Sequence, residues 1–275
     1  MNVQIIKSME DIHTLEDNTI IGDYSFIDSE IQFSGKNNIL IAPPSDGETK
    51  VKLLNTTIEF VSDNSVMFLS NSPRYYSIHA WLYNDVFCSI GTNNYFNQLL
   101  NLKCSDQTNI VIGDDCMFSM GIWLRTSDVH LMYDTKKHRR INYSKSILIG
   151  DHVWAGQDSK ILKGTKIGSG AIIGADTLCA GKTIPSNTAW GGNPARLLRR
   201  DVFFHGKNTS AFTDEDTKKW RKYPKDSYIF EYKKHETIDF SDFEQHIQTM
   251  KSAQERAQFL LSFYSNPAKN RFYIN

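Results

Sequence analysis

From Ile149 the chain reads IGDHVW (149–154), AGQDSK (155–160), ILKGTK (161–166), IGSGAI (167–172), IGADTL (173–178), CAGKTI (179–184), PSNTAW (185–190) and GGNPAR (191–196). The first position of each six is mostly aliphatic. The fifth position holds only small or β-branched residues: Val153, Ser159, Thr165, Ala171, Thr177, Thr183, Ala189 and Ala195. A period of six fits neither a helix nor an alternating strand. It predicts a solenoid of three-sided coils, with the first position in the core and the fifth at a corner.

Glycine often fills the second position of the six, at Gly150, Gly156, Gly168 and Gly174. Because glycine readily adopts positive φ, we expect these four residues to support the tight corners. The repeat also occurs upstream, as IGDDCM, FSMGIW and LRTSDV from residue 112 and as IGDYSF and IDSEIQ from residue 21. Between them, residues 36–108 read as strands without a clear register. We interpret these as irregular coils of one domain over residues 1–202, and a separate N-terminal β module is the alternative.

Two segments interrupt this pattern. Residues 127–146 are polar and charged and predict a protruding loop, which in solenoids often carries function. Residues 203–275 predict an α-helical appendage. Two capping boxes are expected in it, Thr213 with Asp216 and Ser241 with Glu244. After the second, helical spacing is kept by Phe243, Ile247, Met250, Ala257, Leu260, Leu261 and Tyr264. A cap on the solenoid end or a packing arm is favoured over an acceptor-binding domain.

Composition excludes several function classes. Lys plus Arg and Asp plus Glu both number 31, so no basic excess points to nucleic acid or to an anionic membrane. The four cysteines form no CxxC pair and no zinc spacing, and we expect reduced thiols. The first residues lack a basic segment followed by an apolar run, and nowhere is there an apolar stretch long enough to span a bilayer. We expect a cytoplasmic protein without an integral membrane segment or a metal.

His130 is the candidate catalytic base. It lies at the start of the 127–146 loop, two residues after Asp128. Histidine can accept a proton near neutral pH, as a general base must. An isolated histidine is more often a surface or structural residue, so the loop position adds only modest support.

The stretches CMFSMGIWLRTSDVHLMYD (116–134) and SKSILIGDHVWAG through GGNPARLL (144–198) resemble the hexapeptide-repeat acyltransferases. More narrowly, they resemble the bacterial sialate and polysialate O-acetyltransferases. The resemblance covers residues 110–202, is thin upstream and is absent from the tail. It implies a mainly β protein, a left-handed parallel β-helix, that acts as an acetyl-CoA-dependent O-acetyltransferase. The implied acceptor is a glycan, with a sialic acid of a lipooligosaccharide or capsule favoured, and the implied assembly is a homotrimer with sites between subunits.

The resemblance also assigns roles to individual residues. His130 matches the catalytic base, and Trp154 matches an aromatic beside the thioester, although Trp123 and Trp190 in the same column leave a structural role open. His152 is expected at the surface or an interface rather than as a second base. The positions that match the CoA groove are Gly156, Ala175, Ala180, Lys182, Asn193, Pro194, Arg196 and Arg199, with Arg200 as a further candidate. Arg125, for a sugar carboxylate, and Asn97 are the acceptor-side candidates.

Three other functions stay open. The acceptor of a hexapeptide acetyltransferase could instead be another sugar, an amino sugar, serine or a xenobiotic. The same fold serves γ-class carbonic anhydrases, which bind zinc through three histidines including a closely spaced pair, and the spacing of His130, His138 and His152 disfavours that class. The third alternative is a non-catalytic β-helical scaffold, against which the SDVH and HVWAG stretches argue.

Overall fold

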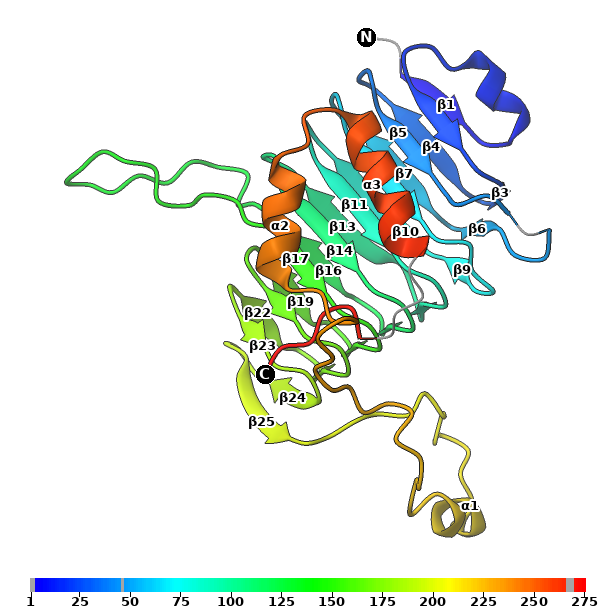
Figure 1. Ribbon diagram of the computed structural model, residues 1–275, viewed down its shortest axis with the longest axis vertical. Coiled ribbons are helices and arrows are strands. Elements are labelled where there is room, and N and C mark those ends of the chain that lie inside the picture. Colours follow the sequence, from blue (N-terminus) through cyan, green and yellow to red (C-terminus); the bar gives the residue numbers. More distant parts are fainter. Residues whose placement is uncertain (1–2, 46, 266–269) are drawn as a thin grey trace.

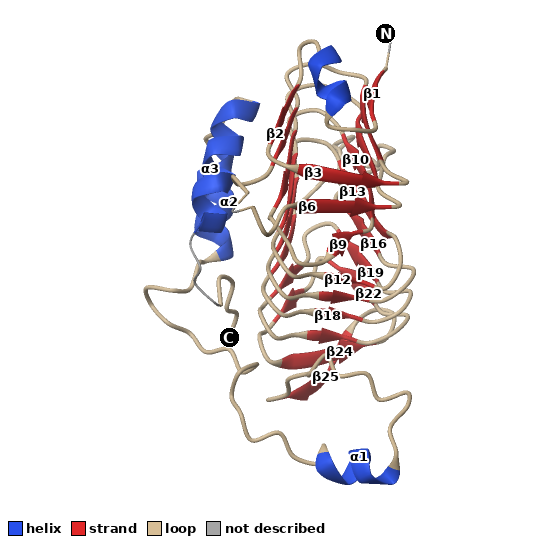
Figure 2. Cartoon of the chain, turned by 90° about the vertical axis from the view of Figure 1, so that its right-hand side faces the viewer, coloured by secondary structure: helices blue, strands red, loops and turns tan. Residues whose placement is uncertain are grey.

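The computed structural model describes residues 3–45, 47–265 and 270–275. Its strands form a left-handed parallel β-helix with three flat faces (Figures 1 and 2). Each coil places one strand on each face, and the strands of successive coils pair in parallel. The strands at the two ends, Gln4–Ile6 and Arg196–Arg200, pair antiparallel with their neighbours. The expected fold class is therefore confirmed.

Three faces make up the prism. Sheet A runs in the order β1 (Gln4–Ile6), β4 (Glu30–Phe33), β7 (Thr57–Phe60), β10 (Ile78–Leu82), β13 (Leu100–Cys104), β16 (Trp123–Arg125), β19 (Lys160–Leu162) and β22 (Leu178–Ala180). Sheet B runs β2 (Thr19–Ile21), β5 (Ile39–Ile41), β8 (Val66–Leu69), β11 (Phe87–Ile90), β14 (Asn109–Ile112), β17 (Ile147–Ile149), β20 (Lys166–Ile167) and β23 (Thr183–Ile184).

The third face has an N-terminal and a C-terminal part. Sheet C holds β3 (Tyr24–Ile27), β6 (Val51–Leu54) and β9 (Tyr75–Tyr76). Sheet E holds β12 (Tyr95–Phe96), β15 (Met117–Phe118), β18 (Trp154–Ala155), β21 (Ile172–Ile173), β24 (Thr188–Gly191) and the antiparallel β25 (Arg196–Arg200). Residues 36–108 thus form coils in the same faces as the later repeat, and a short 3-10 helix (Glu10–Thr14) precedes the first coil.

The six-residue repeat builds the core as expected over its first thirty residues. The inward aliphatics Ile149, Ile161 and Ile167 are fully buried, and so are the small corner residues that follow the same period. After Cys179 the predicted register is wrong by one residue. Ile184, not Pro185, pairs with Ile167 at the next inward position, because the turn through Gly181 is one residue shorter. Thr183, placed at a corner by the repeat, is consequently exposed.

The reason for glycine at the second position also differs from the prediction. None of these four glycines has a positive φ, which falls two residues later, as at Asp158 and Asp176. Instead, a Cβ on Gly150, Gly156 or Gly168 would come within 2.7–2.8 Å of a backbone nitrogen of the next coil. Glycine is needed here because adjacent coils stack so closely.

The C-terminal segment contains α1 (Asp214–Lys219), α2 (Phe240–Gln248) and α3 (Ala253–Ser265). The capping box of Thr213 with Asp216 is confirmed. The Ser241 box is wrong: Asp239 caps α2 by accepting hydrogen bonds from the amides of Ser241 and Asp242, and Glu244 pairs with Lys166 at 2.5 Å. The apolar periodicity is also divided between two helices instead of following one.

Helices α2 and α3 lie along the outer side of sheet B, while α1 lies beyond the end of the prism (Figure 2). Apolar side chains of both helices pack on outward residues of sheet B such as Phe68, Phe87 and Leu148. The middle strands of this sheet, such as β8 and β17, are therefore buried on both sides, which explains their continuous apolar sequences. Helices α2 and α3 therefore pack along one face of the prism.

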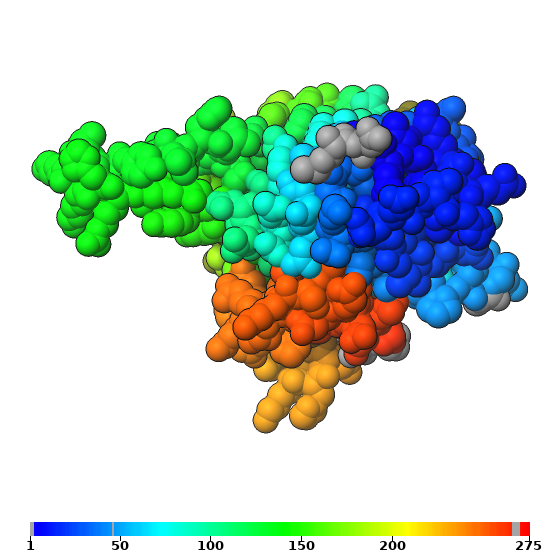
Figure 3. All heavy atoms as spheres, turned by 90° about the horizontal axis from the view of Figure 1, so that it is seen from above, coloured from blue at the N-terminus to red at the C-terminus, as the bar shows by residue number. Residues whose placement is uncertain are grey.

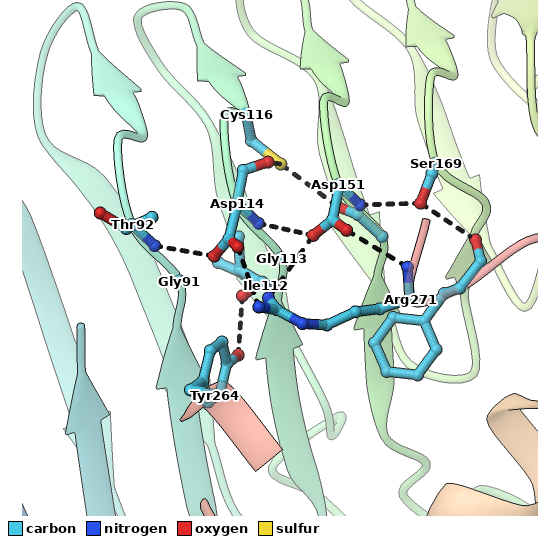
Figure 4. A network of polar contacts seen from close by, with 12 residues as sticks. Gly91, Thr92, Ile112, Gly113, Asp114, Cys116, Asp151, Ser169, Tyr264 and Arg271 are labelled. Carbon is cyan, nitrogen blue, oxygen red and sulfur yellow. Dashed lines mark hydrogen bonds and ion pairs between the residues drawn. The ribbon is translucent and has the colours of Figure 1, made fainter. Parts of the chain in front are cut away.

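A buried polar network ties the chain's end to the coils (Figure 4). Arg271, 2% exposed, lies 3.0 Å from the Asp114 carboxylate and 3.7 Å from that of Asp151. Its guanidinium lies 5.0 Å from the centre of the Tyr264 ring, and the Tyr264 hydroxyl donates to the Ile112 carbonyl at 2.9 Å. The C-terminal segment is thus anchored by charge as well as by apolar packing.

Candidate functional site

The 127–146 segment forms an arm that leaves the prism after β16 and returns at β17 (Figures 1 and 3). A cavity of about 570 Å³ lies at its root. Among its lining side chains are those of Tyr83, Lys103, Asp106, Asp128, His130 and Arg140. The cavity lies at the corner between sheets A and B, because its walls come from the segments that join the strands of these sheets.

His130 is held at this cavity by its backbone. Its amide donates to the Asp128 carbonyl at 2.6 Å, and its carbonyl accepts from the Asn142 side-chain amide at 2.7 Å. Val129, between them, has a φ of +53°, which a β-branched residue rarely adopts. These contacts fix the position of His130, an exposed residue that lines the cavity.

An ion pair between Asp128 and Lys163 holds the root of the arm. The Lys163 ammonium donates to the Asp128 carboxylate, and the Asn142 amide donates to the same oxygen at 3.2 Å. The hydrogen bond from Lys163 lowers the pKa of Asp128, so this carboxylate stays charged at neutral pH. Sequence reasoning missed Lys163 and Asn142, because they join His130 only through the fold.

Arg125 lies on the outward surface of β16, next to this corner. Its Cα partners in the neighbouring strands are Lys103 and Leu162. The Arg125 side chain is half-buried, and its Nε is buried without a hydrogen-bond partner in the described part of the chain. Ala180 follows Leu162 in the same row of sheet A, and Lys182 lies at the next corner.

Trp154 belongs to a different face. It lies in sheet E, half-buried, and its indole nitrogen donates to the Ser119 hydroxyl at 3.4 Å. Asn97 is on the same face, where its side chain accepts a hydrogen bond from Tyr95 at 3.1 Å. A single chain therefore does not bring Trp154 and His130 together: the first lies in sheet E and the second in the arm between sheets A and B.

The residues expected to bind CoA lie on separate surfaces of the prism. Ala175 is exposed at the corner between sheets E and A, whereas Gly156 beside it is buried by coil stacking. Five further candidates are exposed at the C-terminal end of the prism: Asn193, Pro194, Arg196, Arg199 and Arg200. The three arginines could contact an anionic ligand by charge, and Asn193 and Pro194 by their backbone. The small side chain of Ala175 leaves space for a narrow ligand chain.

His152 does not lie on the surface as expected. It is 7% exposed, stacked on Phe204 with ring centres 4.0 Å apart and on Tyr228 at 4.4 Å. Its Nε2 lies 3.1 Å from the Phe204 carbonyl. Burial lowers the pKa of His152, which suits a neutral, structural ring that holds the segment after β25 against the coil.

The three histidines considered for zinc lie apart: His138 is exposed on the arm and His152 is buried beneath Phe204. The described residues contain no group of three or more His, Cys, Asp or Glu side chains placed to hold a metal ion. In the same residues, no helix is both long and apolar enough to cross a membrane.

Comparison with known proteins matches residues 146–181 to the model of the bacterial transferase hexapeptide family (six repeats). A putative acetyltransferase of Bacillus subtilis (strain 168) is 34% identical over 117 residues, which are 40% of this chain and 67% of the relative. The chain belongs to the hexapeptide-repeat transferases.

Two further proteins are similar to this member of the hexapeptide-repeat transferases. A polysialic acid O-acetyltransferase of Escherichia coli O1:K1 / APEC is 31% identical over 41% of this chain. The aligned part spans only 36% of that enzyme's length. The crystal structure of the polysialic-acid-specific acetyltransferase NeuO superposes with a TM-score of 0.59 and 27% identity, covering 74% of this chain and 94% of that one.

Proposed function

We propose that this protein is an O-acetyltransferase that moves an acetyl group from acetyl-CoA to a hydroxyl of a cell-surface glycan. A sialic acid in a lipooligosaccharide or capsule is the favoured acceptor. The similarity to a polysialic acid O-acetyltransferase and to the polysialic-acid-specific acetyltransferase NeuO supports an activity of this kind. The observation that carries the proposal is the position of His130, an exposed residue that lines a cavity and whose backbone is fixed by hydrogen bonds.

In this reaction His130 accepts the proton of the acceptor hydroxyl as the hydroxyl oxygen attacks the acetyl carbonyl carbon. The new carbon–oxygen bond forms, the carbon–sulfur bond breaks, and the proton passes from His130 to the departing thiolate. General-base assistance of this kind contributes about 10²–10⁴-fold to the rate. The roles of Asp128, Asn142 and Lys163 are to hold the loop that presents the imidazole.

We propose a homotrimer in which the groove is shared by two chains. The arm supports this, because its large apolar residues are 53–60% exposed and need a covering surface: Val129, Leu131, Met132, Tyr133, Ile141 and Tyr143. A second copy would bring its own sheet E, with Trp154, Asn97 and Ala175, toward His130 of the first. Trp154 would then orient the thioester, and Arg196 and Arg199 would meet the phosphates of CoA.

Acetyl-CoA turnover against a panel of sialylated and neutral glycans tests this function. Transfer should release CoA in proportion to a new ester on the glycan, and mild alkali should remove that acetyl group because esters hydrolyse and amides do not. An alkali-stable product would identify an N-acetyltransferase instead. Absence of acetyl-CoA binding would support the scaffold alternative.

A further inference from the structure

The outward surface of sheet A carries two neighbouring cations beside the cavity. Lys103 on β13 and Arg125 on β16 are Cα partners in adjacent parallel strands, so their side chains project side by side from the same surface. Both are half-buried. Like charges directly opposite each other destabilise a sheet, so an adjacent pair of cations indicates that this surface meets an anion.

The acidic side chains around this pair already have partners. Glu59, two strands away, lies 2.7 Å from the His79 ring, and Asp106 pairs with Arg140 at 2.7 Å. Asp128 pairs with Lys163. Within residues 3–45, 47–265 and 270–275, neither Lys103 nor Arg125 forms an ion pair within 4.0 Å. The chain thus leaves positive charge available at this point although its net charge is zero.

Two indoles flank the cations. Trp81, the Cα partner of Lys103 on β10, and Trp123, two residues before Arg125, have ring centres 5.9 Å apart and planes 6° apart. Both rings are half-buried, and the His79 ring packs on Trp81 at 3.6 Å. These aromatic surfaces are held rigidly and stay partly accessible. Flat apolar rings beside fixed polar groups are the chemistry that recognises the C–H face of a sugar together with its substituents.

We infer that Trp81, Lys103, Trp123 and Arg125 form a binding site for an acidic sugar of the acceptor glycan. The carboxylate is held by Lys103 and by the Arg125 guanidinium, which suits a bidentate contact, and the sugar ring lies against the indoles. Lys103 also lines the cavity that contains His130, so a chain bound on this surface leads to the catalytic base. This inference rests on the proposed function and names what selects its acceptor.

The test measures binding of oligosialic acid and of the same oligomer with its carboxylates reduced to alcohols, by calorimetry. The wild-type protein should bind the acidic oligomer at least tenfold more tightly. Lys103→Gln and Arg125→Gln should each weaken that binding by about tenfold to a hundredfold, because each removes a charge-assisted hydrogen bond. Binding of the reduced oligomer should stay unchanged.

Lys52→Gln is the matched control. Lys52 is also a half-buried lysine beside a tyrosine, with its ammonium 5.9 Å from the Tyr75 ring, against 5.3 Å for Lys103 and Tyr83. The inference is overturned if Lys103→Gln and Arg125→Gln bind the acidic oligomer as Lys52→Gln does. It is also overturned if either variant changes the sedimentation coefficient, since the surface would then be a subunit contact.

Turnover separates this inference from the proposed function. If the enzyme acetylates acidic and reduced acceptors with equal KM, the function stands and the carboxylate site is refuted. If the protein binds the acidic oligomer through Lys103 and Arg125 but transfers no acetyl group to it, the site stands and the O-acetyltransferase assignment is refuted.

Discussion

Replacing Arg271 by methionine should destabilise the protein strongly, and more at pH 8 than at pH 5. The substitution keeps a long apolar side chain against Tyr264 but removes the cation that lies 3.0 Å from Asp114 and 3.7 Å from Asp151. Removing one partner of a buried ion pair costs about 3–5 kcal/mol, because a buried carboxylate loses its counterion. We expect a loss of this size in the free energy of unfolding at pH 8.

The pH dependence follows from Asp151. Burial raises the pKa of Asp151 to about 6, and the charge of Arg271 opposes that rise. A raised pKa means that the folded state binds the proton of Asp151 more tightly than the unfolded state does. The contribution of Asp151 to stability is therefore greatest below about pH 4 and declines as the pH rises through 6. Without Arg271 the pKa of Asp151 rises further. Each added pKa unit lowers the free energy of unfolding by about 1.4 kcal/mol at pH 8 but by almost nothing at pH 5.

Urea unfolding at pH 5 and pH 8, followed by circular dichroism, measures the two losses. Lys233→Met is the control, because Lys233 pairs with Glu236 at the surface and should contribute less than about 1 kcal/mol. An equal loss at both pH values, or a loss no larger than that of the control, would show that Arg271 does not neutralise Asp151.

Two further changes test the stacking of the coils and the arm. Gly156→Ala should lower the free energy of unfolding by about 1–3 kcal/mol, because the new Cβ would lie 2.7 Å from the Ala175 nitrogen. Gly206→Ala is the control, because a Cβ there meets open space and should leave stability unchanged. Similar melting temperatures for both variants would contradict the steric argument. Replacing residues 131–141 by a short glycine–serine link should convert a trimer into monomers in analytical ultracentrifugation and abolish turnover. A fully active monomer would refute the shared site.

Much of the fold could be predicted because a six-residue period directly indicates a solenoid of three-sided coils. The inward column at Ile149, Ile161 and Ile167 is buried as expected. The period could not reveal the one-residue slip after Cys179, since Thr183 and Ile184 both suit a strand and only pairing with Ile167 distinguishes them. It also could not show that the second-position glycines are needed for close contact between coils.

The covering of sheet B by α2 and α3 did have a signal in the sequence. Strands such as Val66–Leu69 and Ile147–Ile149 are apolar at every position, which is typical of strands buried on both sides. The start of α2 was misplaced because Ser241 and Asp239 both suit an N-cap, and the engagement of Glu244 with Lys166 depends on tertiary structure.

At the candidate site, the sequence could suggest the base but not its support. The position of His130 next to a break in the repeat can be read from the sequence. The contacts from Asn142 and Lys163 cross the arm and a neighbouring coil, so no spacing rule reveals them. The separation of Trp154 from His130 within one chain likewise depends on which face of the prism each residue occupies.

The central claim is that His130 acts as the general base, and the direct measurement is the kcat of His130→Ala with acetyl-CoA and a sialylated acceptor. We predict a loss of at least about 100-fold in kcat with unchanged affinity for acetyl-CoA. His235→Ala, an exposed histidine of the C-terminal segment, should keep the wild-type kcat. A near-normal kcat for His130→Ala would contradict the account.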